Sequence, residues 1–367
     1  MRRIKTLFVT ALAASTLGGA VAHADYLIGV AGPMTGSNAA FGEQYRRGAE
    51  KAVADINAKG GVLGQKLALA VGDDACDPKQ AVNIANDLAA KKVNVVIGHF
   101  CSGSSIPASD VYAESNIIEI SPGSTSPKYT ERGLANVFRT CGRDDDQGPT
   151  AAKYLNQKFK GKKIAIVHDK SAYGKGLADE FQKSLNGLGT KEVAYEAITV
   201  GDKDFSPLIS KLKSLNVDLI YFGGYQTEAG LIARQTHDQG LKARMVGGDA
   251  LMTEEFWSIT GPTGQGTLMT FGPDPRLLPQ NAKLVAEFRA DKYEPETYTL
   301  YTYASIQAWA QAVEKAGSVD TAKVEKVLKS DKFDTALGVI GFDAKGDITA
   351  PGYVIYAWKD GKYAYDE

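Results

Sequence analysis

The sequence predicts an α/β protein of two lobes, each with a mostly parallel sheet flanked by helices. Short apolar runs alternate with segments in which apolar residues recur at helical spacing, from about residue 27 to residue 271. The apolar runs are continuous, as in strands covered on both faces. With 367 residues, the chain is also too long for one typical domain. Alternating strands and helices of this kind favour two parallel sheets.

The first 24 residues read as a secretory signal peptide. A basic start precedes the apolar stretch Leu7 to Val21, and Ala22-His23-Ala24 forms a cleavage signal, so we expect cleavage before Asp25. The apolar stretch is too short and too rich in small residues for a membrane anchor. We therefore expect a soluble mature chain in the periplasm. The 42 basic and 43 acidic residues nearly balance, and no concentrated basic surface indicates nucleic-acid binding.

Strands and helices alternate through the first 140 residues. Phe41, Tyr45 and Ala49 recur at helical spacing, and Gly60-Gly61 ends that helix. Asp77-Pro78 suits an N-cap followed by proline in the first turn of a second helix. The predicted strands are 27–31, 66–71, 93–98, 117–120 and 137–140.

A second series starts at residue 163. Its predicted strands are 163–167, 192–198, 217–222, 244–247 and 267–271, with helices that include 177–188 and 205–215. After Pro273 the pattern changes to helices at 284–293, 301–316 and 321–329, and then a strand at 353–358.

The first sheet needs more helical cover than residues 25–142 supply, so the chain should return to the first lobe near residue 273 and cross again near residue 350. We expect lobe 1 to comprise 25–142 plus 273–350, and lobe 2 to comprise 143–272 plus 351–367. Three crossing segments would then form a hinge.

Three cysteines allow one disulfide and one free thiol in an oxidising compartment. Cys76 and Cys101 each lie just past a predicted strand, and neighbouring parallel strands would bring those ends together. A bond between them would close a loop of about 25 residues, worth about 3–4 kcal/mol in the chain-entropy model. Cys141 is expected to be buried and inert. No cysteine or histidine spacing suits a zinc site.

Two strand ends carry the functional signal. The strand at 93–98 runs into His99-Phe100-Cys101-Ser102-Gly103, and the strand at 117–120 runs into Ser121-Pro122-Gly123-Ser124-Thr125. Ligands of open α/β sheets bind outside the carboxyl ends of the strands. Backbone N–H and side-chain O–H groups there suit a carboxylate. The competing interpretation is two ordinary turns rich in serine and glycine.

Enzyme motifs are missing from the sequence. It contains no G-x-S-x-G, no P-loop and no G-x-G-x-x-G. His99 and His168 both follow apolar strands, where a hydrogen-bonded structural histidine is the simpler interpretation. A Ser102–His99 dyad has no evident third member. Asp144-Asp145-Asp146 lacks the ligand spacing of a calcium loop and favours a solvated or capping turn. We expect no catalysis, no metal and no cofactor.

The remaining polar residues suit an amino acid, which needs donors for its carboxylate and acceptors for its ammonium. Ser102 and Thr125 can donate. Asp249 ends the strand at 244–247 and is the best-placed carboxylate for an ammonium across the cleft, although an N-cap role fits equally well. Tyr173 and Tyr225 lie on loops after strands, where each can wall a pocket or simply pack on the surface.

The chain resembles the branched-chain amino-acid binding proteins of bacterial ABC transporters, the Leu/Ile/Val-binding type. The resemblance extends from the mature start to the final strand. It is carried most clearly by Asp55-Ile56-Asn57-Ala58-Lys59-Gly60-Gly61, Asp73-Asp74-Ala75-Cys76-Asp77-Pro78, Gln147-Gly148-Pro149-Thr150-Ala151-Ala152 and Tyr221-Phe222-Gly223-Gly224-Tyr225.

This resemblance implies a type I periplasmic binding protein fold, with two lobes, a three-strand hinge and a ligand in the cleft. It supports the Cys76–Cys101 disulfide. It implies that Ser102 and Thr125 bind the ligand carboxylate, with the backbone around Gly123. It places Tyr173 and Asp249 at the ammonium, and Tyr225 in the wall of the second lobe. The implied partner is a membrane ABC permease, and we expect a monomer.

Departures from the family pattern indicate a small ligand. Asp249 stands where the family often has glutamate, so the ammonium would move towards lobe 2 or a water would intervene. Phe100 stands where leucine is expected, and Tyr298 with Phe41 adds aromatic bulk, which leaves less room for a side chain. We expect alanine, valine, proline or γ-aminobutyrate rather than leucine. A sensory receptor for a signalling partner, or an exported hydrolase using Ser102, are the alternatives.

Overall fold

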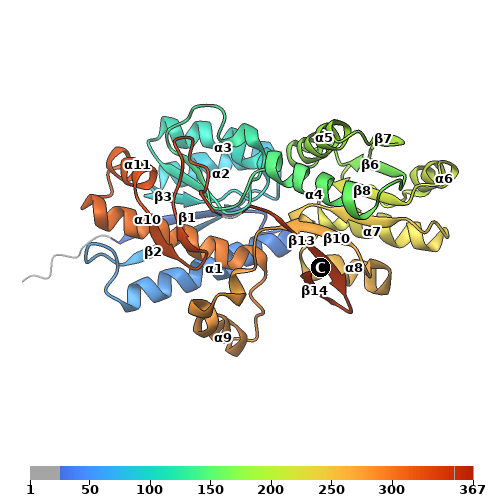
Figure 1. Cartoon of the computed structure of the whole chain (residues 1–367). Helices are drawn as coiled ribbons and strands as arrows, with labels where there is room; N and C mark the ends of the chain where they lie inside the picture. The colour runs from blue at the N-terminus through green and yellow to red at the C-terminus, as the bar shows by residue number, and fades with distance from the viewer. Residues whose placement is uncertain (1–24, 351, 367) are drawn as a thin grey trace, which may run out of the picture.

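The computed structural model describes residues 25–350 and 352–366, which form two lobes side by side (Figure 1). The predicted signal peptide lies outside these residues. No helix within the described ranges is both long and apolar enough to cross a membrane.

A five-stranded parallel sheet forms the first lobe. Its order is β2 (Leu67–Asp73), β1 (Tyr26–Gly32), β3 (Val95–Ile97), β4 (Ile118–Ser121) and β5 (Val137–Arg139). All four pairings are parallel, as continuous apolar strands predict.

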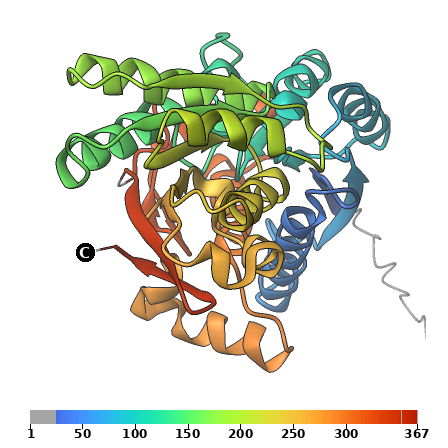
Figure 2. The ribbon, with the colours of Figure 1, turned by 90° about the vertical axis from the view of Figure 1, so that its right-hand side faces the viewer.

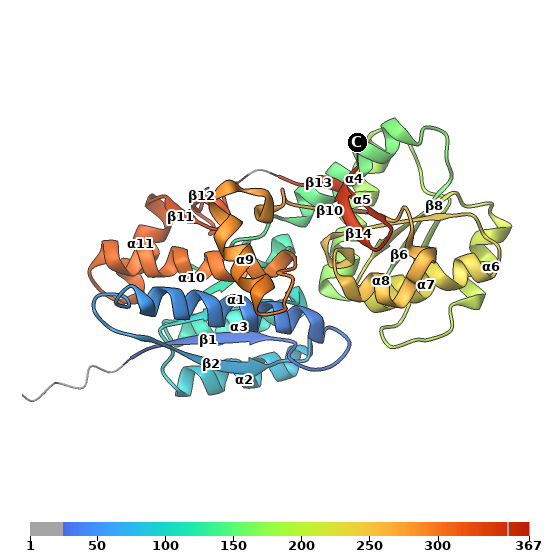
Figure 3. The same ribbon diagram turned by 90° about the horizontal axis from the view of Figure 1, so that it is seen from below.

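Helices cover both faces of this sheet (Figure 3). One face carries α1 (Ala39–Ala58) and α10 (Thr297–Ala316), and the other carries α2 (Pro78–Ala90) and α3 (Ser102–Glu114). Asp77 caps α2 by accepting a hydrogen bond from the Gln80 N–H at 2.8 Å, as its sequence predicts. The lobe is completed by α9 (Ala282–Ala290), α11 (Thr321–Ser330) and the hairpin of β11 (Phe333–Thr335) and β12 (Gly338–Ile340).

The second lobe has a seven-stranded sheet. Its order is β14 (Lys362–Tyr365), β13 (Val354–Lys359), β10 (Leu268–Phe271), β9 (Arg244–Gly247), β8 (Leu219–Gly223), β6 (Ile164–His168) and β7 (Ala194–Ala197). Figure 3 shows α4 (Asp144–Lys158) and α5 (Ala172–Gly187) on one face, with α6 (Ser206–Ser214), α7 (Gln226–Asp238) and α8 (Glu254–Thr260) on the other.

The second sheet is mostly parallel, as the predicted fold class requires, but one edge is antiparallel rather than parallel. β13 pairs antiparallel with both β10 and β14. β10 leads out of the lobe towards the hinge whereas β13 enters from it, so the two run in opposite directions. Asp360 and Gly361, with φ of 48° and 79°, form the two-residue turn of the terminal hairpin (Figure 2).

Three segments join the lobes. The chain leaves the first sheet after β5 and enters α4, leaves the second sheet after β10 and reaches α9, and crosses once more before β13. We propose that these crossings divide the chain as the sequence suggests, with 25–142 plus 273–350 in lobe 1 and 143–272 plus 351–367 in lobe 2.

The disulfide joins Cys76 to Cys101 across 25 residues, which confirms the predicted pairing. It ties the loop after β2 to the start of α3. Cys141 is buried and free, and burial raises the pKa of its thiol well above the usual range. That thiol is therefore a poor nucleophile.

Candidate interlobe binding site

A pocket between the lobes brings together residues far apart in the sequence. It is lined by Phe100, Ser102, Gly123, Tyr173, Tyr225, Asp249 and Ala250, and thus contains six of the nine candidates from the sequence. The other three, Phe41, Thr125 and Tyr298, are fully buried. Phe41 and Tyr298 pack against the Phe100 ring, and Thr125 lies two residues beyond Gly123.

Serine hydroxyls fix the two loops at the strand ends of lobe 1. Ser121 Oγ donates to the His99 carbonyl at 2.6 Å, and Ser124 Oγ donates to the Phe100 carbonyl at 3.0 Å. Ser105 Oγ and Ser124 Oγ lie 2.5 Å apart. Because these bonds link one loop to the other, the two loops form one rigid surface.

Arg139, at the end of β5, anchors the second loop from beneath. Its side chain is completely buried, and it donates to the carbonyls of Ser124 at 2.7 Å and Ser126 at 3.0 Å. Its Nε donates to Asp347 at 2.6 Å, which provides the counter-charge. The loop that carries Thr125 is therefore held by a buried ion pair.

Ser102 and Thr125 lie where a carboxylate could dock. Ser102 is the first residue of α3, where backbone N–H groups and the helix dipole favour an anion. Its Oγ accepts a hydrogen bond from the Ser126 N–H at 3.3 Å. The Thr125 hydroxyl is buried and makes no hydrogen bond within the described residues. Gly123 is required by packing, since a Cβ there would lie 2.6 Å from the Phe100 ring.

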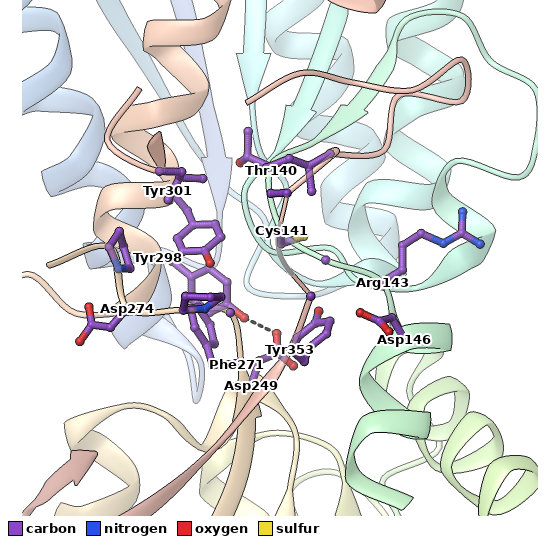
Figure 4. Close-up of a pocket in the computed structure, with 18 of the residues that line it drawn as sticks. Thr140, Cys141, Arg143, Asp146, Asp249, Phe271, Asp274, Tyr298, Tyr301 and Tyr353 are labelled. Atoms are coloured by element: carbon purple, nitrogen blue, oxygen red, sulfur yellow. Dashed lines mark hydrogen bonds between the residues drawn. The ribbon is translucent and has the colours of Figure 1, made fainter. Parts of the chain in front are cut away.

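Asp249 lines the interlobe pocket from the second lobe, and Figure 4 shows its hydrogen bond with Tyr298. Its carboxylate accepts hydrogen bonds from Tyr173 Oη at 2.7 Å, from Gln147 Nε2 at 2.9 Å and from Tyr298 Oη. Its side chain caps no helix, so the N-cap alternative does not describe this residue. Burial raises the pKa of Asp249, and the hydroxyl and amide donors oppose that rise.

Aromatic rings close the pocket around Phe100. Phe41 stacks on Phe100 with ring centroids 4.2 Å apart, and Tyr298 meets Phe100 edge-on at 5.2 Å. The ring centroid of Tyr225 lies 6.1 Å from that of Phe100 and 5.1 Å from that of Tyr173. These contacts leave the pocket with essentially no free volume. A ligand therefore needs the lobes or these rings to move before it can enter.

Two further buried residues near Asp249, both on α4, were not predicted as site residues from the sequence. Gln147 donates to Asp249, as described. Asp144 is completely buried, and neither carboxyl oxygen makes a hydrogen bond within the described ranges. Burial, reinforced by the nearby Asp249, raises the pKa of Asp144 well above its usual range.

The solvated or capping turn predicted for Asp144-Asp145-Asp146 is therefore wrong for Asp144, whereas Asp145 and Asp146 are exposed. The sequence holds no signal for this difference. It arises because the first turn of α4 packs between the lobes.

His99 has a structural environment. Its Nδ1 lies 2.6 Å from Asp74 Oδ2, and its Nε2 lies 3.0 Å from Tyr112 Oη, all of them buried. The structure shows no hydrogen bond between His99 and Ser102 among the residues it describes. Both ring nitrogens of His99 are engaged by Asp74 and Tyr112 rather than by Ser102. This arrangement removes the geometric basis for a Ser102–His99 dyad.

Comparison with known proteins agrees with this architecture. Residues 26–362 match the family model described as periplasmic binding protein. The chain is 55% identical to a Leu/Ile/Val-binding protein homolog 1 of Brucella melitensis, over 98% of this chain and 99% of the relative. It is 51% identical to an amino acid binding protein of Pseudomonas aeruginosa, over 97% and 96%.

Solved structures give the same result. A leucine binding protein from Thermotoga maritima superposes with a TM-score of 0.87 at 29% identity, covering 93% of this chain and 98% of that one. A branched-chain amino acid substrate-binding protein from Streptococcus pneumoniae, in complex with isoleucine, gives 0.86 at 27% identity with the same coverage. The chain therefore belongs to the periplasmic binding protein family, among relatives of the Leu/Ile/Val-binding type.

Proposed function

We propose that this protein is a periplasmic receptor that captures a small aliphatic amino acid between its lobes and delivers it to an ABC importer. One observation carries the proposal. Asp249 is buried in the pocket wall and Asp144 is buried near it, and neither forms an ion pair among the described residues. Two buried carboxyl groups without a cation favour a ligand that brings a positive charge.

The ligand carboxylate would bind lobe 1. Ser102 at the start of α3 and the Thr125 hydroxyl would supply donors there, next to the loops that the serine network links. The ammonium would then face Asp249 and Asp144. An amino acid matches this separation of donors and acceptors, whereas a neutral ligand would leave the carboxyl groups unpaired.

Binding would couple to hinge motion. With the lobes apart, the ligand docks on lobe 1, and closure adds Tyr173, Tyr225 and Asp249 from lobe 2. Such closure shifts an existing equilibrium between two arrangements. The closed pair of lobes is the form that a membrane permease would recognise. The predicted cleavage before Asp25 would release the receptor into the periplasm.

The ligand is small, because aromatic rings fill the side-chain region. Phe41, Phe100 and Tyr298 contact one another, so a leucine side chain would have to displace one of them. Overpacking of this kind costs about 1–3 kcal/mol. Alanine, valine, proline and γ-aminobutyrate demand less space and are the ligands we propose.

Calorimetry with alanine, valine, proline, γ-aminobutyrate and leucine tests the proposal. We expect at least one of the first four to bind more tightly than leucine. Phe100→Leu should improve leucine binding relative to alanine, because it removes ring volume beside Phe41. Clearly tighter binding of leucine by the unmodified protein would rule out the small pocket, and heat from none of the five would rule out the receptor for aliphatic amino acids.

A further inference from the structure

A separate cavity lies where the three crossings meet (Figure 4). Its volume is about 280 Å³, and its walls include Cys141 from the first crossing, Phe271 and Leu278 from the second, and Tyr353 from the third. Asp249 is the only residue that lines both this cavity and the interlobe pocket. The cavity therefore adjoins the proposed amino-acid site through Asp249 and Tyr298, while its other walls come from the crossings.

Aromatic rings form much of its wall. Phe271 meets Tyr298 and Tyr301 edge-on, with ring centroids 5.3 and 5.4 Å apart. Leu278 and Leu337 add aliphatic surface. Walls of this kind bind an apolar ligand body, and aromatic faces also attract an organic cation.

The charged groups at the cavity are mostly acidic, and arginines neutralise most of them. Arg143 forms ion pairs with Asp145 and Asp347, both at 2.6 Å. Arg276 pairs with Asp274 at 2.7 Å. These three carboxylates are therefore already paired.

Asp146 differs from them. It lines the cavity and makes no side-chain ion pair with any residue that the structure describes. Its Oδ2 lies against the third crossing, 2.6 Å from where a Cβ on Gly352 would be. The neighbouring Tyr353 has a buried hydroxyl that makes no hydrogen bond within the described ranges. Asp146 thus lies against Gly352, the chain neighbour of Tyr353, and neither the Asp146 carboxyl group nor the Tyr353 hydroxyl has a side-chain partner among the described residues.

We propose that this cavity binds a small organic amine. Its ammonium would pair with Asp146 and donate to the Tyr353 hydroxyl, and its apolar body would pack on Phe271, Tyr301 and Leu278. The volume lies just below the roughly 300–1,000 Å³ of typical ligand pockets, which restricts the ligand to a compact amine. Since both lobes contribute walls, the bound amine would contact this arrangement of the hinge. The proposal does not depend on the identity of the amino-acid ligand.

Calorimetric titration with 2-phenylethylamine tests this site, with 2-phenylethanol as the neutral analogue. We expect the amine to bind more tightly than the alcohol. Asp146→Asn should weaken binding of the amine by about fivefold, which is the effect of losing one partly exposed ion pair. The affinity for the alcohol should not change. Equal affinity of the two probes, or no effect of Asp146→Asn, would overturn the assignment of the charge.

A matched pair of tryptophan variants locates the binding. Leu278→Trp should abolish amine binding because Leu278 lines the cavity, whereas Leu277→Trp should not, because Leu277 is 67% exposed and lies outside it. Ser102→Ala should not change the affinity for the amine, but it should weaken binding of an amino acid. Loss of amine binding in Ser102→Ala would place the probe in the interlobe pocket and overturn the proposal. A thermal melt of each variant identifies any that does not fold. If a tryptophan variant does not fold, the amine affinity of Asp146→Asn decides whether the amine binds in this cavity.

Discussion

At the residue scale, several carboxyl groups of the second lobe are buried. Asp249 is satisfied by three neutral donors, and Asp144 has none. A third, Asp169, follows β6 and uses only one oxygen, which accepts the Ser171 N–H at 2.8 Å, while the other is buried without a partner. Such groups are costly to bury when charged, so each should have a measurable effect on binding or on stability.

Asp249→Ala should weaken amino-acid binding by about 2–4 kcal/mol, because the ligand ammonium loses its charged acceptor. Calorimetry of the ligand that the unmodified protein binds gives the measurement. Asp238→Ala, an exposed aspartate of the same lobe, serves as the control and should bind normally. A change of a few tenths of a kcal/mol in Asp249→Ala would remove this residue from the site.

Because of Asp169, the protein should be more stable to unfolding at pH 5 than at pH 7. Burial raises its pKa from 3.8 to about 6, so between these values the folded state binds more protons than the unfolded state. Stability from this group is then fully present below the unfolded pKa and is lost as pH rises through about 6. Its contribution should fall by about 1 kcal/mol between pH 5 and pH 7.

Urea unfolding at both pH values measures this effect. Asp169→Asn keeps an acceptor for Ser171 and should flatten the profile. Asp204→Asn is the matched control, since Asp204 also accepts an N–H two residues on but is exposed. Parallel pH profiles for the unmodified protein and Asp169→Asn would contradict the assignment.

At the scale of elements, buried polar links between strand ends decide where the site can form. The serine network joins the loops after β3 and β4, and the disulfide ties the first of them to the loop after β2. Arg139 at the end of β5 holds the second loop and pairs with Asp347, 208 residues later. The surface of lobe 1 that we propose for the ligand carboxylate is therefore held in place by these links.

Arg139→Ala should destabilise the fold by about 3 kcal/mol, because it removes one of the two arginines that pair with Asp347 and the donors to two loop carbonyls. Denaturant unfolding followed by circular dichroism measures the change. Arg132→Ala breaks a more exposed pair with Asp110 and should have a much smaller effect. Equal losses in the two variants would show that the buried network is not what holds the loop.

For the whole molecule, direct hydrogen bonds link the two lobes in the arrangement that the structure shows. Glu296, just before α10, accepts from Gln44 Nε2 in lobe 1 at 2.8 Å. From the second lobe it accepts the Glu254 N–H at 2.6 Å and the Thr253 hydroxyl at 3.1 Å. Gln226 of α7 adds a bond to the Ser37 carbonyl at 2.9 Å. None of these residues lines the interlobe pocket, so they can influence affinity through closure alone.

Glu296→Ala should weaken amino-acid binding about tenfold, the effect of about 1.5 kcal/mol for a hydrogen bond to a charged group. The measurement belongs at pH 8, because burial raises the pKa of Glu296 to about 7. Small-angle scattering should show a more open unliganded protein. Glu294→Ala, which pairs only with Arg276 and Arg289 among the described residues, is the control. Unchanged affinity and dimensions in Glu296→Ala would show that these contacts do not hold the lobes together.

The sequence by itself determined the fold class and most strands, because apolar periodicity is a local signal, and it indicated the disulfide because both cysteines follow predicted strands. It also marked Ser102, Gly123 and Asp249 through their positions after strands. Only the tertiary structure decided that Phe41 and Tyr298 pack on Phe100, that Asp144 is buried, and that β13 runs antiparallel to β10. These features depend on how distant segments meet at the hinge, and no local pattern records which charged residue will face another lobe rather than water.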